Sequence, residues 1–144
     1  MRLTSTAFQP DGGIPRRFTC DGEDVSPELI LHDLPEGTVS LVLVMDDPDA
    51  PAGTWDHWIA YDIPPTTLIP EGAGDLGTAG TNSWGRPGYG GPCPPRGTHR
   101  YVFTLYALDA RLGLAPGARK SMVLGALAGH VLAEATLVGR YSRR

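Results

Sequence analysis

One apolar run that ends in acidic residues and prolines constrains this chain more than any other feature. Residues 41–45 are all apolar, and Asp46-Asp47-Pro48-Asp49-Ala50-Pro51 follows directly. A strand that is apolar on both faces is typical of the centre of a sheet. Proline fixes φ and lacks an N–H donor, so a strand cannot continue through the prolines. We therefore predict a central strand over 39–45 whose end presents carboxylates on a rigid loop, where proteins often place their sites.

Two later segments have the composition of strands. Residues 54–63 and 99–108 are rich in aromatic and β-branched side chains, which favours strands. A shorter early strand is predicted over 18–20. Residues 68–95 contain eight glycines, and a loop of that length in a compact domain is usually functional or mobile.

The C-terminal part of the chain changes its apolar period. Val123, Leu127 and Val131 recur every four residues, which predicts a helix over 118–133. A last strand is predicted over 136–141. Strands followed by a late helix indicate a mainly β fold, an antiparallel β domain with a peripheral helix. The length of 144 residues suits a single domain over 1–144.

Charge and composition exclude several classes of protein. The net charge is −4 with no run of basic residues, so no nucleic-acid partner is expected. No apolar run is long enough to predict a transmembrane segment. The first residues lack the apolar region of a signal peptide, so we expect a cytoplasmic protein. In that compartment Cys20 and Cys93 should be reduced thiols, with a disulfide as the alternative.

Side-chain alternation along the strands indicates where a site would lie. Asp47 shares a face of the first strand with Leu43 and Met45, because side chains alternate with period 2. By the same rule, one face of the second strand carries Trp55, His57, Ile59 and Tyr61. One face of the third strand carries His99, Tyr101 and Phe103.

If these strand ends meet, they form a small cavity with Trp55 and Tyr101 as walls. Its polar groups would be Asp47, Asp49, His57 and His99. Each has a structural alternative: the acidic residues could be turn formers, the histidines satisfied core or surface residues, and the tryptophans core aromatics. The joint occurrence favours the site.

The chemistry of such a cavity suits a small polar head group. Histidines donate hydrogen bonds and titrate near pH ~6.5, so we expect anion affinity to fall as the pH rises through that range. Backbone N–H groups of Gly90, Gly91 and Cys93 could cradle an anion. The two carboxylates, Asp47 and Asp49, would orient the histidines or receive an ammonium group.

The chain resembles the phosphatidylethanolamine-binding protein family, in the bacterial and archaeal branch called Raf kinase inhibitor-like proteins. The segments that carry the resemblance are Phe18-Thr19-Cys20-Asp21-Gly22, Ser26-Pro27-Glu28-Leu29, Asp47-Pro48-Asp49-Ala50-Pro51, His57-Trp58, Gly91-Pro92-Cys93-Pro94-Pro95 with Gly97, and His99-Arg100-Tyr101. The resemblance implies an antiparallel β-sandwich with a small anion-binding pocket. The positions that match the ligand-binding residues of the family are Asp47, Asp49, Pro51, Trp55, His57, Gly91, Pro94, His99 and Tyr101.

What the resemblance implies for function is a non-catalytic binding and regulatory module. The expected partner is a small anionic or phosphorylated ligand, with a kinase or protease as the protein target and a homodimer by analogy with bacterial relatives. No cofactor and no metal are expected. The alternative is a metal-dependent or acid–base hydrolase that uses the Asp/His cluster. The lack of a recognised nucleophile or metal motif argues against the hydrolase. A third hypothesis is a protein inhibitor that contacts its target through 68–89.

Overall fold

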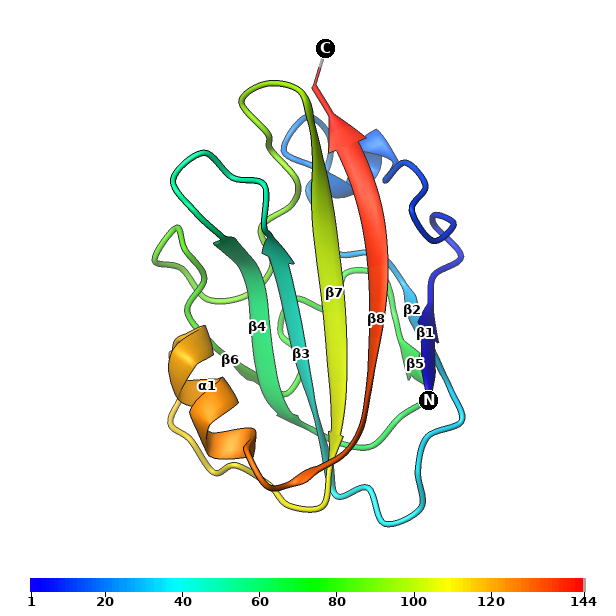
Figure 1. Ribbon diagram of the computed structural model, residues 1–144, viewed down its shortest axis with the longest axis vertical. Helices are drawn as coiled ribbons and strands as arrows, with labels where there is room; N and C mark the ends of the chain where they lie inside the picture. The colour runs from blue at the N-terminus through cyan, green and yellow to red at the C-terminus, as the bar shows by residue number, and fades with distance from the viewer. Residues whose placement is uncertain (144) are drawn as a thin grey trace.

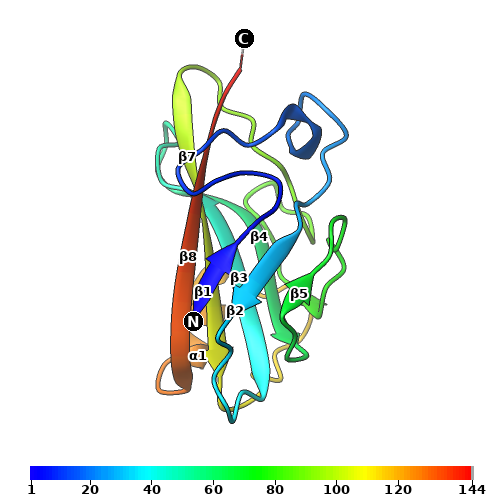
Figure 2. The same cartoon turned by 90° about the vertical axis from the view of Figure 1, so that its right-hand side faces the viewer.

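The computed structural model describes residues 1–143 and consists of two antiparallel sheets with a single α-helix. The larger sheet has the strand order β6-β4-β3-β7-β8, and the smaller has the order β1-β2-β5. Figure 2 shows the small sheet packed as a second layer on one face of the large sheet, and Figure 1 shows α1 on the opposite face, near β4 and β6. The elements are β1 (Arg2–Thr4), a 3₁₀ turn (Arg16–Phe18), β2 (Leu29–His32), β3 (Ser40–Asp47), β4 (Trp55–Ile63), β5 (Leu68–Ile69), β6 (Thr78–Ala79), β7 (Thr98–Leu108), α1 (Lys120–Leu127) and β8 (Val131–Ser142).

β3 is the central strand, as the sequence predicts. Leu41, Leu43 and Met45 point into the core between the two sheets. Val42 and Val44 point into a second apolar cluster beneath α1. Burial on both faces explains why the strand is apolar at successive positions. The strand ends two residues later than predicted, because Asp46 and Asp47 still pair with β4.

The helix is shorter than the sequence predicts. α1 ends at Leu127, and Gly129 adopts a φ of +84° that terminates the helical path. Residues 131–133 open β8, where Val131 pairs with Leu108 and Ala133 with Ala107. The prediction of a helix to residue 133 was wrong because an apolar spacing of four residues runs on from the helix into the strand. β8 contains the predicted strand over 136–141 and begins five residues before it.

The early strand predicted over 18–20 does not form. Phe18 closes the 3₁₀ turn, and the Thr19 hydroxyl donates to the carbonyl oxygen of Arg16 at 2.8 Å. Cys20 forms a disulfide with Cys93, with Cα atoms 5.5 Å apart. The prediction of two reduced thiols is therefore wrong. This bond joins the 3₁₀ region to the loop that precedes β7.

The long segment over 68–95 is mostly irregular, as predicted, but it contains the two-residue strands β5 and β6. They pair with β2 and β4. Among residues 1–143, no helix has the length and apolar character needed to cross a membrane.

Candidate functional site

The strand order places the predicted site residues at one edge of the large sheet. β3 lies between β4 and β7 and is antiparallel to both, so its C-terminal end lies beside their N-terminal ends. Asp47 is the last residue of β3, His57 lies near the start of β4 and His99 lies near the start of β7. All three side chains are at least nine-tenths buried. They line one pocket of about 240 Å³, whose wall consists of Asp47, Ala50, Pro51, Trp55, His57, Trp84, Cys93, Pro94, Pro95 and His99.

A β-bulge brings His57 into this pocket. Met45 pairs with Trp58, whereas Asp46 pairs with Asp56, which leaves His57 as the extra residue in β4. A bulge turns two successive side chains toward one face, and both His57 and Trp58 are buried on the core side.

Beyond the bulge the alternation is reversed. Ile59 and Tyr61 belong to the cluster beneath α1, not to the face that carries His57. The predicted shared face of Trp55, His57, Ile59 and Tyr61 is therefore wrong for its last two members. The predicted faces of Asp47 and of His99, Tyr101 and Phe103 are confirmed by the burial of these side chains.

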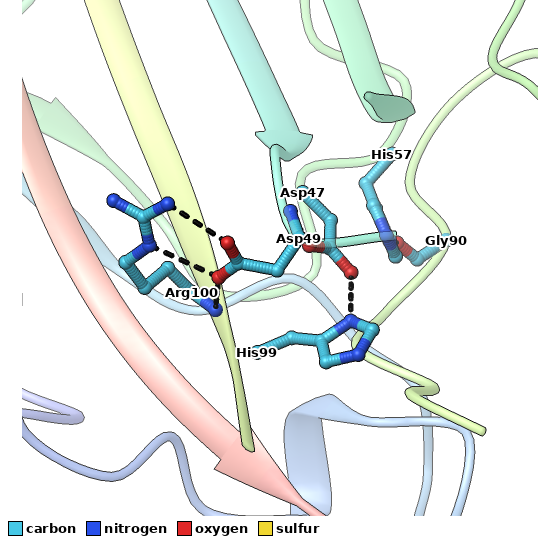
Figure 3. Close-up of polar contacts among 6 residues, drawn as sticks. All are labelled: Asp47, Asp49, His57, Gly90, His99 and Arg100. Carbon is cyan, nitrogen blue, oxygen red and sulfur yellow. Dashed lines mark hydrogen bonds and ion pairs between the residues drawn. The ribbon is translucent and has the colours of Figure 1, made fainter. Parts of the chain in front are cut away.

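Asp47 and His99 form a buried ion-pair geometry (Figure 3). His99 Nδ1 lies 2.6 Å from Asp47 Oδ2. The backbone N–H of Asp49 donates to Asp47 Oδ1 at 2.8 Å. Because an aspartate carboxylate only accepts hydrogen bonds, the proton lies on Nδ1 of His99 and its Nε2 is left for the pocket.

His57 is oriented by a backbone carbonyl. Its Nδ1 donates to the Gly90 oxygen at 2.7 Å, which fixes the proton on Nδ1 and leaves Nε2 as a lone pair in the neutral ring. Burial lowers the pKa of His57 below its ordinary value of 6.5, against the opposing effects of the Gly90 carbonyl and the Asp47 charge. The expectation that His57 titrates near its unperturbed value is thus corrected: at neutral pH it carries no charge.

Aromatic side chains pack around His57. Its ring meets Tyr101 edge-to-face at 5.2 Å and Trp84 at 4.9 Å between centroids. Trp84 in turn packs edge-to-face on Trp55 at 5.6 Å. The Tyr101 hydroxyl is buried without a hydrogen-bond partner in the described part of the chain. Burial, with the nearby Asp47 charge, raises the pKa of Tyr101 far above its ordinary range, so the hydroxyl keeps its proton.

Asp49 does not orient a histidine. Its carboxylate accepts from the Arg100 backbone N–H at 2.9 Å and from the guanidinium at 3.0 and 2.8 Å. Figure 3 shows this pair beside Asp47, with Asp49 turned toward Arg100 and away from His99. Hydrogen bonds from Arg100 hold the pKa of Asp49 well below its usual range. Asp49 therefore braces the loop after β3 against β7.

Two of the backbone N–H groups predicted to cradle an anion are already used. The N–H of Gly90 donates to the His57 carbonyl at 3.0 Å. The N–H of Gly91 donates to Asp24 Oδ1 at 2.8 Å. A Cβ at Gly91 would clash with Asp24 and with the Phe18 backbone, so only glycine permits this approach. Gly91 thus positions the loop and does not line the pocket.

The sequence interpretation missed three lining residues, Ala50, Trp84 and Pro95, and it named Cys93 only for its backbone N–H. Trp84 is the most consequential, because it contacts both Trp55 and His57. The sequence feature that could have pointed to Trp84 is a large aromatic residue inside a loop rich in glycine.

Asp46 points to the other face of the sheet. There Lys120 Nζ lies 3.1 Å from the Asp46 carboxylate and 2.7 Å from the Asp56 carboxylate. Within residues 1–143, no three His, Cys, Asp or Glu side chains are grouped closely enough to hold a metal ion.

Comparisons with known proteins identify a family. The family model described as Phosphatidylethanolamine-binding protein matches residues 4–142. A UPF0098 protein of Methanothermobacter thermautotrophicus is 50% identical over 150 residues, which cover 99% of each chain. A second UPF0098 protein, from Aquifex aeolicus, is 47% identical and covers 99% of this chain and 89% of its own.

Two solved structures are similar over nearly the whole chain. A homologue of phosphatidylethanolamine-binding protein from Chlamydia trachomatis has a TM-score of 0.96 and 41% identity, covering 99% of this chain and 97% of that one. Escherichia coli YbcL, described as a new member of the mammalian PEBP family, has a TM-score of 0.91 and 29% identity, covering 99% and 98%.

Proposed function

Because this chain belongs to the phosphatidylethanolamine-binding protein family, we propose that it is a non-catalytic binding protein for a small phosphorylated or other anionic ligand. Family membership supports a protein of binding type. The observation that carries the ligand class is the convergence of His57 and His99 on one pocket, each with Nδ1 held by the protein. Among residues 1–143 we find no protein hydrogen bond to the Nε2 atom of either ring.

The remaining wall suits a head group with a polar end and an apolar body. His99, when protonated, offers an N–H from Nε2 to the pocket. The Tyr101 hydroxyl, which has no hydrogen-bond partner in the described part of the chain, is a second donor on the ring that packs against His57. Trp55, Trp84 and the prolines supply apolar surface for whatever carries the anion. In this proposal Pro51 and Pro94 shape the pocket, whereas Asp49 and Gly91 act by holding its loops.

Calorimetric titration with phenyl phosphate tests this function. We expect saturable binding at one site per chain. His99→Ala should weaken it by about 1–3 kcal/mol, the size of a hydrogen bond between charged groups. His130→Ala is the matched control, because His130 is an exposed histidine that pairs with Asp109. Equal affinity in the wild type and His99→Ala would exclude the pocket as the binding site.

An acid–base hydrolase is the second hypothesis, and the neutral ring of His57 is the observation that favours it. A buried imidazole with a free lone pair can act as a general base. No serine, threonine or free cysteine is among the residues that line the pocket, so water would have to be the nucleophile. Release of p-nitrophenol from p-nitrophenyl phosphate that is lost in His57→Asn would favour the hydrolase over the binding protein.

A protein target and a homodimer also remain proposals. The target would be a kinase or protease, and it would contact 68–89, the segment that contributes half-exposed Trp84 to the rim of the pocket. Capture of a target by the full chain and its loss in Trp84→Ala would support this. Light scattering of the purified chain tests the dimer.

The cytoplasmic location stays a prediction as well. Disulfides are typical of oxidising compartments, but they also occur in intracellular proteins of hyperthermophiles. Fractionation of the source cells tests the location.

A further inference from the structure

The pocket is richer in hydrogen-bond acceptors than an anion site should be. Asp47 is acceptor-only, and its carboxylate has about four lone-pair positions. Two of these are used, by His99 Nδ1 and by the Asp49 N–H. His57 adds a second acceptor, because its only proton is donated to the Gly90 oxygen. Two acceptor groups therefore face the space in which the anion would lie.

Fixed positive charge is scarce in the same place. No lysine or arginine is among the described lining residues, and the N–H groups of Gly90 and Gly91 are bonded within the protein. Arg100 is paired with Asp49, and Arg86 lies over Trp84, 5.7 Å from the ring centroid. The lining side chains that can carry positive charge are the two histidines, and burial disfavours that charge on His57, which leaves His99 as the cation that can donate from Nε2. The uncharged donors nearby are the backbone N–H of Cys93, the Tyr101 hydroxyl and the indole N–H groups of Trp55 and Trp84.

A fully ionised oxyanion would be poorly matched to this wall. Its oxygens would face the Asp47 charge and the His57 lone pair, and neither acceptor would gain a partner. An oxyanion that carries one O–H group would donate that proton to one of these acceptors and offer its other oxygens to His99. A site that leaves a polar group unpaired with the wrong ligand discriminates strongly against that ligand.

We propose that this pocket selects oxyanions that bring their own proton, of the class of a phosphate monoester monoanion, over equally charged oxyanions without one. This inference rests on the proposed function and names the ligand class of that same site. Phosphate monoesters have a second pKa of about 6, so they carry an O–H in mildly acid solution. Sulfate monoesters do not, although they are also tetrahedral monoanions.

The charged and titratable groups that face the pocket or pack behind it decide how this preference changes with pH. On the pocket side they are Asp47, His57 and His99, with Tyr101 packed against His57 and with the Asp49–Arg100 pair and Arg86 at the margin. On the far side of the sheet they are Asp46, Asp56 and Lys120. A sulfate monoester has no proton to lose, so its affinity reports the titration of these protein groups alone. The additional pH dependence of a phosphate monoester then reports the proton on the ligand.

Titration calorimetry with phenyl phosphate and phenyl sulfate at about pH 5.5, below the second phosphate pKa of about 6, tests the proposal. Both probes are then mainly monoanions with the same apolar body, and they differ by one O–H. We expect phenyl phosphate to bind about 100-fold more tightly, less than the 10⁴-fold or more of fully enclosed sites because this pocket is partly open. The ratio should shrink toward the value for two fully ionised esters as the pH is raised to about 8, two units above that pKa.

His57→Phe removes the ring lone pair, because a phenyl ring fills the same place without a hydrogen-bond acceptor. The ratio should fall several-fold in this variant and in Asp47→Asn, and stay unchanged in His130→Asn. Equal affinity for the two esters in the wild type would overturn the selection while leaving the anion pocket intact. Binding of neither ester would overturn the proposed function together with this inference.

The same chemistry could belong to a free metabolite or to a lipid head group. Vesicles that contain phosphatidic acid, a lipid phosphate monoester, form the second arm. Binding to these vesicles together with weak binding of phenyl phosphate would assign the lipid, and the reverse would assign a free monoester. If wild-type chain retained on the vesicles is released equally by both soluble esters, the selection for a proton is wrong.

Discussion

His99 Nδ1 lies 2.6 Å from Asp47 Oδ2, and both side chains are buried at the point where β3 ends and β7 begins. The two residues are 52 positions apart in the chain. Their contact depends on the antiparallel pairing of β3 with β7, so the sheet topology itself builds the polar part of the pocket. Since a buried carboxylate is costly without a partner, Asp47 and His99 depend on each other.

Asp47→Asn tests this dependence. The change removes the charge but keeps the shape, and we expect it to lower the free energy of unfolding by about 1–3 kcal/mol. Urea denaturation monitored by tryptophan fluorescence measures it. Asp49→Asn is the matched control, because Asp49 and Arg100 are 30% and 48% exposed and exposed pairs contribute at most about 1 kcal/mol. Equal losses in the two variants would contradict a special role for the buried pair.

The pH dependence of stability reports on His57. Burial holds its folded-state pKa below the ordinary 6.5, so the unfolded chain binds more protons between these two values. Its contribution to stability is therefore complete above about pH 6.5 and is lost as the pH falls toward the lowered pKa. We expect the urea midpoint of the wild type to fall between about pH 7 and pH 5, and His57→Asn to reduce this slope. Parallel curves for the two proteins would show that His57 titrates normally.

Reduction of the Cys20–Cys93 disulfide should destabilise the fold and loosen the pocket. The bond spans 73 residues, and closing a loop of that size in the unfolded state is worth on the order of 4 kcal/mol. Cys93 also lines the pocket, so ligand affinity should fall with stability. Unfolding of Cys20→Ser and of reduced wild type should give the same lowered midpoint. An unchanged midpoint in a sample with two titratable thiols would refute this.

The fold could be predicted from the sequence where each strand has a clear local pattern. β3, β4 and β7 were placed within two residues, because continuous apolar runs and aromatic alternation are properties of a single strand. The helix end at Leu127 was misplaced because the apolar spacing continued into β8.

The site was only partly predictable, for a physical reason. Side-chain alternation along each strand, together with the family resemblance, brought Asp47, His57 and His99 to one pocket, as the structure has them. The bulge at His57, the pairing of Cys20 with Cys93 and the contact of Trp84 with His57 each depend on a partner elsewhere in the fold. Asp49 followed the motif but turned to Arg100, because strand alternation does not decide where a side chain in the following loop will point.

A crystal structure of the chain grown with phenyl phosphate at about pH 5.5, below the second phosphate pKa of about 6, tests the account most directly. We predict the phosphate group between His57 and His99, within hydrogen-bond distance of both Nε2 atoms, with the phenyl ring against Trp55 or Trp84. A phosphate group bound elsewhere on the surface, with only water in the pocket, would contradict the account.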